Sequence, residues 1–374
     1  VEMMHMKPII VTARTALILL IGCVLSACSP DTPDTAPSTP GAARNDAAPA
    51  STSAELPEVI VVVGMEGVKE RLKQENWWGE ENRDEQLTVP HLMITRIHPA
   101  WRVVAQEMTV PDKKATFYRL MLPLVMHAND MVLERRGRLL AARAALDAGE
   151  SITPEGLEQL KQAAVLLRVM KEEDAAALTV ANPDLGSLID DLLYRLDVIP
   201  AGLALGQAAY ESGYGTSRFA ADGNALFGQW TYGGGGMAPQ EKRASKGDYG
   251  VAAFDWPFDS VRGYFINLMS HPAYEDFRRL RAEMRAAGEP LSSLRMADGL
   301  VRYSERGQEY VDGLKGIIRV NGLDIADDAV FRDEPIRFIV TEDSPEEAAA
   351  LEQKIAEARD SGELAEIYAR MRLE

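Results

Sequence analysis

The chain has few of the residues that most often build disulfides or metal sites. It contains 2 cysteines and 5 histidines among 374 residues. Both cysteines, Cys23 and Cys28, lie near the N-terminus, so the body that follows has no internal disulfide and must be stabilised by packing. No two histidines have the spacing of metal ligands, which argues against a metal hydrolase and gives no reason to expect a metal or another cofactor.

Motifs for nucleotide binding and for serine hydrolases are missing as well. The sequence has no GxSxG elbow, and no Lys-Ser or Lys-Thr pair follows the glycine run from Gly233 to Gly236. A net charge of −17 without a compensating basic run argues against nucleic acid as a partner. Apolar residues make up 46% and charged residues 26%, which is typical of a soluble globular protein.

The N-terminus has the pattern of a bacterial lipoprotein signal. Lys7 and Arg14 flank an apolar run, Thr15 to Leu25, that is short for a membrane span. The run ends in Leu25-Ser26-Ala27-Cys28, which resembles a lipobox, where the cysteine is acylated and becomes the mature N-terminus. We therefore expect a signal peptide over residues 1–27 and a lipid on Cys28. The alternative is an ordinary cleavable signal with a chance cysteine.

A tether is expected after the lipid. Residues 28–55 are almost entirely Ser, Thr, Pro, Ala, Asp and Gly, a composition that cannot bury enough apolar surface to offset its ordering entropy. Ser29 follows the cysteine directly, whereas Asp at this position would favour retention in the inner membrane. We therefore expect the protein at the periplasmic face of an outer membrane.

The remainder predicts a mainly α protein of the α+β class. A β-branched run, Val59 to Val63, predicts a strand. After it the apolar residues follow a helical period of 3.6, and helices are predicted over residues 113–140, 200–212, 259–270, 274–287, 292–303 and 308–320. Two more helices are expected to begin at Thr153-Pro154 and at Asn182-Pro183. Pro123 is expected to kink or divide the first helix. Strand-like stretches at 226–232 and 250–254 predict a small β-hairpin lobe, and a strand at 336–340 precedes a helix that begins at Ser344.

The most informative segment is Gln207-Ala-Ala-Tyr-Glu-Ser-Gly-Tyr-Gly215. It places Glu211 in the last turn of a helix, with Gly213 as the left-handed cap. The negative end of the helix dipole disfavours an ionised carboxylate there by about a few tenths of a kcal/mol. A raised pKa suits a general acid, because the proton stays available near neutral pH. An exposed helix-end glutamate without a role is the alternative.

Several segments together form a specific pattern: Gln207 to Gly215, Asn224 with Leu226-Phe227-Gly228, Ala253-Phe254-Asp255 before Asp259-Ser260, and Arg302-Tyr303-Ser304 with Tyr310 and Ile317-Ile318. On these residues, the region from Val198 to about Asn321 resembles the glucosaminidase domain of glycoside hydrolase family 73, in particular its Bax-type branch. Upstream residues resemble the helical region before that domain: Lys114, Phe117, Leu122 to Val125 and Asn129.

The resemblance implies a lysozyme-like helical catalytic domain with a small β-hairpin lobe, preceded by a helical region. It also implies a peptidoglycan hydrolase that cleaves β-1,4 N-acetylglucosaminyl linkages of glycan strands. The family's acid falls on Glu211 and its active-site tyrosine on Tyr303. The residues that would line the sugar cleft are Asn224, Phe227, Trp230 and Tyr249, with core packing as the alternative role of each aromatic.

The second catalytic group stays open. Glycosidases generally pair an acid with a base or nucleophile, and the candidates here are Glu241 and Asp248 in the hairpin loop. The substrate's own acetamido group is the alternative nucleophile. A lytic transglycosylase shares the fold and the single glutamate, although Asn-x-Leu-Phe-Gly at 224–228 argues against it. A wall-binding protein without turnover is the other alternative.

These expectations divide the chain into a signal peptide (1–27), a tether (28–55), a helical N-terminal region (56–190), a glucosaminidase catalytic domain (191–325) and a C-terminal tail (326–374). The tail faintly resembles the last segment of periplasmic solute-binding proteins. It is too short for that fold, and no function is assigned to it.

Acylation of Cys28 predicts that the protein partitions with membranes. Cys28→Ala should move it to the soluble fraction or leave it unprocessed, because the lipid attachment atom is gone. Metabolic labelling with a clickable fatty acid measures this directly, and wild-type protein that takes up no label would rule out lipidation.

Overall fold

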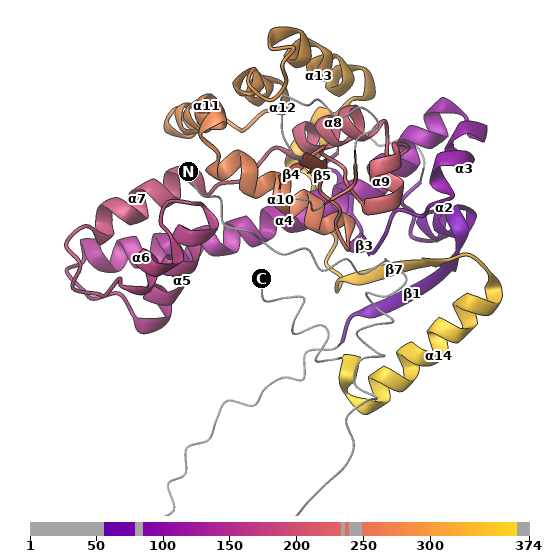
Figure 1. Ribbon diagram of the computed structural model, residues 1–374, viewed down its shortest axis with the longest axis horizontal. Coiled ribbons are helices and arrows are strands. Elements are labelled where there is room, and N and C mark those ends of the chain that lie inside the picture. Colours follow the sequence, from indigo (N-terminus) through magenta and orange to yellow (C-terminus); the bar gives the residue numbers. More distant parts are fainter. Residues whose placement is uncertain (1–55, 79–84, 233–235, 239–248, 365–374) are drawn as a thin grey trace, which may run out of the picture.

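The computed structural model describes residues 56–78, 85–232, 236–238 and 249–364 (Figure 1). The expected signal peptide, the tether and Cys28 lie outside these residues. The described part is mainly helical with small sheets, as predicted. Within it, no helix combines the length and the apolarity needed to cross a bilayer.

A single helix of 38 residues, α4 (Val110–Asp147), runs through most of the molecule (Figure 1). It begins at Thr109, whose side chain accepts a hydrogen bond from the Asp112 backbone N–H. The helix continues through Pro123, so proline does not divide it, and the kink that was the other expected effect stays a prediction. Pro123 is buried, and α4 packs against helices α7 (Leu185–Arg195), α8 (Ala201–Ser212) and α10 (Pro257–Ser270). This packing offsets the hydrogen bond that proline removes.

The end of α4 carries a group of shorter helices, α5 (Pro154–Leu166), α6 (Glu172–Ala176) and α7 (Figure 1). The predicted start at Thr153-Pro154 is confirmed, since the Thr153 hydroxyl accepts from the Gly156 N–H at 3.0 Å. Two arginines hold the carbonyl groups at the end of α7. Arg136 donates to the Leu196 oxygen at 2.7 Å, and the buried Arg281 donates to the Arg195 oxygen at 2.6 Å. Such partners satisfy helix-end carbonyls that have no partner within the helix.

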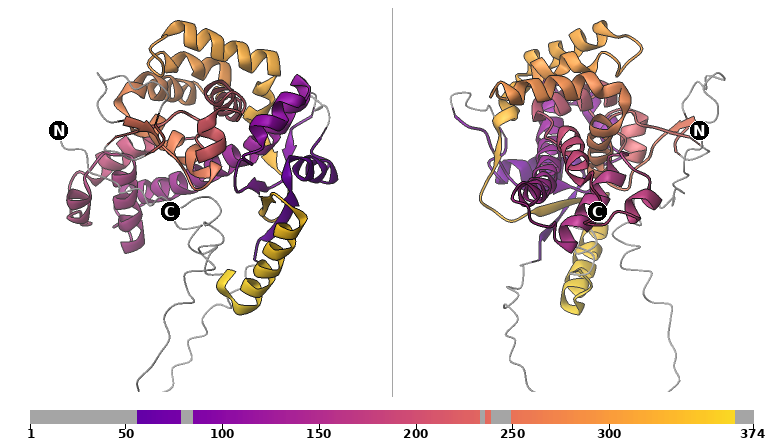
Figure 2. Two further views of the ribbon diagram at one scale, coloured as in Figure 1. Left: turned by 45° about the vertical axis from the view of Figure 1, so that its right-hand side comes forward. Right: turned by 90° about the vertical axis from the view of Figure 1, so that its left-hand side faces the viewer.

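A three-stranded parallel sheet lies at the other end of the molecule and joins distant parts of the chain (Figure 2). Its order is β1 (Glu58–Val63), β7 (Arg337–Glu342) and β3 (Leu92–Ile94), with Glu58 opposite Arg337 and Leu92 also opposite Arg337. Helices α2 (Gly64–Gln74) and α14 (Pro345–Ser361) pack against it.

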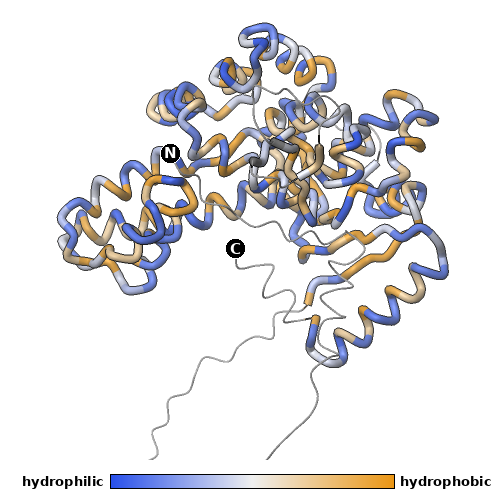
Figure 3. Tube along the Cα trace, in the orientation of Figure 1, coloured by the Kyte–Doolittle hydropathy of each residue, from blue (hydrophilic) through white to orange (hydrophobic). Residues whose placement is uncertain are grey.

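The residues assigned to a separate C-terminal tail therefore supply the central strand of this sheet. The predicted strands at both ends of the chain are confirmed, and both are apolar (Figure 3). The predicted helix start is confirmed as well, since the Ser344 hydroxyl accepts from the Glu347 N–H. A second parallel pair, β2 (Thr88–Val89) with β6 (Val330–Phe331), strengthens the connection between the chain ends.

Three of the remaining helical elements pack against α8, namely α12 (Ser293–Met296), α13 (Gln308–Asn321) and η4 (Leu323–Asp328). The others are α3 (Trp101–Glu107), α9 (Arg218–Gly223), η2 (Pro272–Tyr274), α11 (Glu275–Ala286) and η3 (Ala297–Leu300). The predicted hairpin is confirmed as β4 (Trp230–Tyr232) and β5 (Tyr249–Val251), antiparallel, with shorter strands than expected. The helix predicted over 292–303 is instead the short pair α12 and η3, where Gly299 lies directly against the backbone of Phe277.

Polar contacts fix the start of α8 firmly. The amide of Asn129 on α4 bonds Ile199 twice: it accepts from the Ile199 N–H at 2.9 Å and donates to the Ile199 oxygen at 2.8 Å. Asp327 on η4 accepts from the Gly202 N–H at 3.0 Å, which satisfies a donor in the first turn of the helix. Because Gly202 has no side chain, η4 approaches so closely that a Cβ atom there would lie 2.3 Å from the Leu323 oxygen.

This close approach predicts that Gly202→Ala destabilises the protein by about 1–3 kcal/mol, since either η4 or α8 must move. Gly316→Ala on α13 is the matched control, because nothing lies within 4 Å of an added Cβ there. The control should be neutral or stabilising by up to about 1 kcal/mol, as is usual for glycine replaced by alanine inside a helix. Denaturant unfolding measures both, and equal stabilities of the two variants would contradict the packing described.

Candidate active site

Glu211 lies in the last turn of α8, as predicted. The helix ends at Gly213, whose φ of +59° is the expected left-handed cap. Tyr214 and Gly215 continue in the left-handed region with φ of +60° and +75°. The Ser212 hydroxyl accepts from the Gly215 N–H at 2.8 Å and closes this turn. The turn carries the chain sharply away from the helix directly after the carboxylate.

Burial raises the pKa of the Glu211 carboxyl above its ordinary value. A hydrogen bond from the Tyr310 hydroxyl on α13 acts in the opposite direction, because it stabilises the ionised form. Burial has the larger effect, so the side chain holds a proton at higher pH than an exposed glutamate does. This is the property that general acid catalysis near neutral pH needs.

Four tyrosines lie close enough to this carboxylate to interact with it electrostatically: Tyr264 on α10, Tyr274 on η2, Tyr303 after η3, and Tyr310. Burial raises the pKa of each phenol, so all four are neutral and can donate hydrogen bonds. Tyr303 and Tyr310 stack with ring centroids 5.4 Å apart and an interplanar angle of 11°. The Tyr303 hydroxyl donates to the Phe227 carbonyl oxygen at 3.1 Å. The structure thus brings the predicted Tyr303 close to Glu211, while Tyr310 is the tyrosine bonded to it.

Gln207, one turn before Glu211, connects two of these tyrosines. It is fully buried. Its Oε1 accepts from the Tyr264 hydroxyl at 2.6 Å, and its Nε2 donates to the Tyr310 hydroxyl oxygen at 2.9 Å. Neither Gln207 nor Tyr310 was predicted as a site residue. The signal was present in the sequence, since Gln207 is the one polar residue in the otherwise Ala, Gly and Leu stretch from Ala201 to Ala209.

Two residues expected to line the sugar cleft lie in the core instead. Asn224 is 4% exposed: its Oδ1 accepts from the Ile97 N–H at 3.0 Å, and its Nδ2 donates to the Phe254 oxygen at 3.0 Å. Phe227 is 2% exposed and stacks on Tyr264 with centroids 4.0 Å apart. The expected sugar contact is therefore corrected to a structural role, because Asn224 holds loops together and Phe227 supports the tyrosine behind Glu211.

Of the other predicted residues, the structure describes the side chain of Trp230. Trp230 on β4 is 48% exposed, as a sugar-stacking ring requires. The Tyr249 backbone pairs with Tyr232 in β5, but its side chain lies outside the described residues, as do Glu241 and Asp248. Among described side chains, no second carboxylate contributes to the pKa shift of Glu211.

A glycine gives access to the carboxylate from the hairpin side. Gly228 adopts φ of +60°, and a Cβ there would lie 3.7 Å from the nearer Glu211 carboxylate oxygen. At Gly228 the loop that leads to β4 thus passes close to Glu211 without a side chain.

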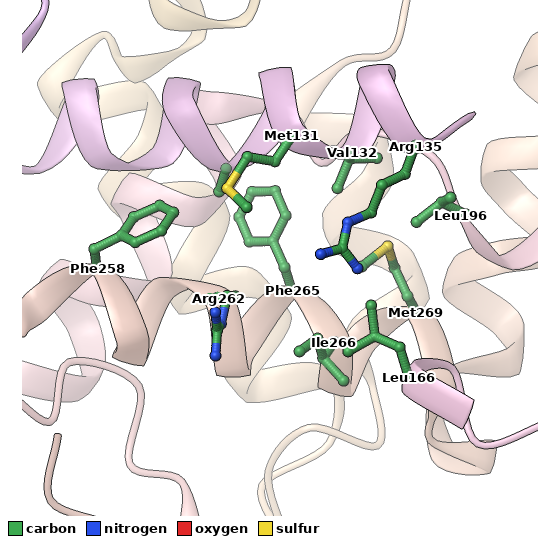
Figure 4. A pocket seen from close by; sticks show the side chains of 11 residues that line it. Met131, Val132, Arg135, Leu166, Leu196, Phe258, Arg262, Phe265, Ile266 and Met269 are labelled. Carbon is green, nitrogen blue, oxygen red and sulfur yellow. The ribbon is translucent and has the colours of Figure 1, made fainter. Parts of the chain in front are cut away.

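A separate apolar cavity of about 40 Å³ lies between α4 and α10 (Figure 4). Phe265, Ile266 and Met269 project from α10 toward Met131 and Val132 of α4. Neither Glu211 nor any of its four tyrosines lines this cavity, so it is distinct from the candidate active site. Over the residues the structure covers, no group of three or more His, Cys, Asp or Glu side chains is arranged to hold a metal ion.

Comparisons with known proteins define the class to which this region belongs. Residues 187–323 match the Glucosaminidase family, described as mannosyl-glycoprotein endo-beta-N-acetylglucosaminidase, so the chain contains a glucosaminidase domain of glycoside hydrolase type. The chain is similar to Protein bax of Escherichia coli (strain K12), with 37% identity over 119 residues. That stretch covers 32% of this chain and 42% of Protein bax. No solved structure gives a significant match.

Proposed function

We propose that the protein hydrolyses β-1,4 N-acetylglucosaminyl linkages in the glycan strands of peptidoglycan, with Glu211 as the general acid. The observation that carries the proposal is the partly buried Glu211 carboxyl, with its raised pKa, at the end of α8 inside a glucosaminidase domain. In the reaction, Glu211 donates its proton to the oxygen of the leaving sugar as the C1–O bond breaks and a nucleophile bonds to C1. The Tyr310 hydroxyl stabilises the carboxylate that remains. Water then adds at C1, and its proton returns to Glu211.

The substrate approaches from the side of Gly228 and the hairpin. That side has no side chain over the carboxylate at Gly228, and it offers the exposed indole of Trp230 as a platform for a pyranose ring. Tyr303 stands behind Glu211 and helps position it through its stack on Tyr310.

We further propose that a lipid on Cys28 anchors the enzyme at the periplasmic face of an outer membrane, with residues 28–55 as the tether that lets it reach the wall.

Glu211→Gln should lower hydrolysis of purified sacculi by at least about 10²–10⁴-fold, because the amide cannot deliver a proton. The thermal midpoint should not fall, since the substitution removes an ionisable group from a partly buried position. Mass spectrometry of the wild-type products tests the reaction itself: a reducing-end N-acetylglucosamine supports a glucosaminidase. A 1,6-anhydro-muramyl end indicates a transglycosylase instead, and intact sacculi indicate a binding protein. Substantial hydrolysis by the variant would remove Glu211 from its role.

A second prediction distinguishes Glu241 from the substrate's acetamido group as the partner of Glu211. We favour the acetamido group, because Glu241 is followed directly by Lys242 and Arg243, a setting typical of a solvated surface charge. Glu241→Gln should then have a mild effect, and a thiazoline mimic of the oxazolinium intermediate should inhibit strongly. If Glu241 is the base or nucleophile, Glu241→Gln should be nearly as inactive as Glu211→Gln, added azide should restore rate, and the thiazoline should not inhibit.

A further inference from the structure

We propose that Gln207 is a positioning residue, whose side-chain amide turns the Tyr310 hydroxyl so that its proton points at the Glu211 carboxylate. The proposal rests on the proposed role of Glu211 as general acid and adds a residue that sets its protonation. It is carried by two hydrogen bonds that join α10, α8 and α13, from Tyr264 to Gln207 and from Gln207 to Tyr310, and by the interaction of the Tyr310 hydroxyl with Glu211.

The direction of these hydrogen bonds follows from their donors. Tyr264 donates to Gln207 Oε1, so the amide presents its Nε2 hydrogens to the other side. There Nε2 donates to the Tyr310 oxygen, which leaves the Tyr310 proton free for Glu211. If the amide were reversed, Tyr310 would donate to Gln207 and could no longer donate to the carboxylate. A hydroxyl that accepts one hydrogen bond is also a stronger donor in the next.

The hydrogen-bonded residues are held rigidly on every side. Gln207 is fully buried, and Tyr264 and Tyr310 are each 1% exposed. Phe227 stacks on the Tyr264 ring, and Tyr303 stacks on the Tyr310 ring. Since these contacts fix the rings, the hydrogen-bond direction is set mainly by the amide.

Few other titratable groups lie close enough to Glu211 to change its pKa. From α10, η2, the segment after η3 and α13 these are Tyr264, Tyr274, Tyr303 and Tyr310, all neutral phenols. In the part of the chain that the structure describes, no charged side chain contributes to its shift. Tyr310 is the group that lowers the pKa against burial, so weakening its hydrogen bond must raise the pKa of Glu211 further.

The test measures the titration of Glu211 by carboxyl carbon NMR in the full chain, with Glu211→Gln to identify the resonance. Tyr310→Phe removes the hydroxyl and should raise the titration midpoint by about one pH unit, the size expected for one hydrogen bond to a carboxylate. Gln207→Met keeps the side-chain length without a donor and should raise it by a smaller amount. The double variant should match Tyr310→Phe alone, because Gln207 acts only through that hydroxyl.

Tyr274→Phe is the matched control. It also loses a buried phenol hydroxyl, but one that bonds Asn267 rather than Glu211, so the midpoint should stay at the wild-type value. If Gln207→Met fails to fold, Tyr264→Phe replaces it. That variant keeps the ring and frees the amide to reverse, so it should raise the midpoint as well.

If the titration midpoint of Glu211 does not change in Gln207→Met, or in Tyr264→Phe when that variant replaces it, the proposal is overturned. It is also overturned if the shift in the double variant equals the sum of the two single shifts. In active protein, the alkaline limb of the kcat/KM profile should move upward with the midpoint. The titration itself needs no turnover, so intact sacculi would count against the proposed function alone, while the NMR result decides the role of Gln207 separately.

Discussion

An ionisable side chain must be kept partly out of water at the end of α8, and most of the surrounding structure serves that requirement. Burial of a carboxylate disfavours its charged form. The helix that carries Glu211 must therefore be held in place by packing and hydrogen bonds from other elements. The Asn129 amide and Asp327 hold its start, and Gly202 lets η4 lie directly against it. The unfavourable free energy of burying the carboxylate arises at the end of α8, whereas the packing that stabilises this helix comes from α4, η4 and α13.

Local chemistry made much of this predictable from sequence. Caps and helical periodicity depend on neighbouring residues, so the starts at Thr153 and Ser344 and the stop at Gly213 were all predicted correctly. The position of Glu211 in a last helical turn followed from the same local signals. Local signals do not decide whether a helix continues through Pro123, because that depends on how deeply tertiary packing buries α4.

Contacts between distant segments were not predictable in this way. Sequence patterns predict a helix over 308–320 that includes Tyr310, yet only the packing of α8 against α13 brings its hydroxyl close to Glu211. Asn224 and Phe227 belong to a recognisable motif, but a motif does not state which way a side chain points, and both point into the core. Likewise, a β-branched strand near each end of the chain gave no indication that the two are neighbours.

That neighbouring arrangement has a consequence for the order of events during synthesis. A growing chain presents β1 and β3 long before β7, which pairs with both, has been made. Until then each has an open edge of the kind that pairs with other chains. The helix that bears Glu211 is therefore complete well before the sheet is. The sheet can close only when the last part of the described chain arrives, so a ribosome that stalls before residue 337 leaves two unpaired strands exposed.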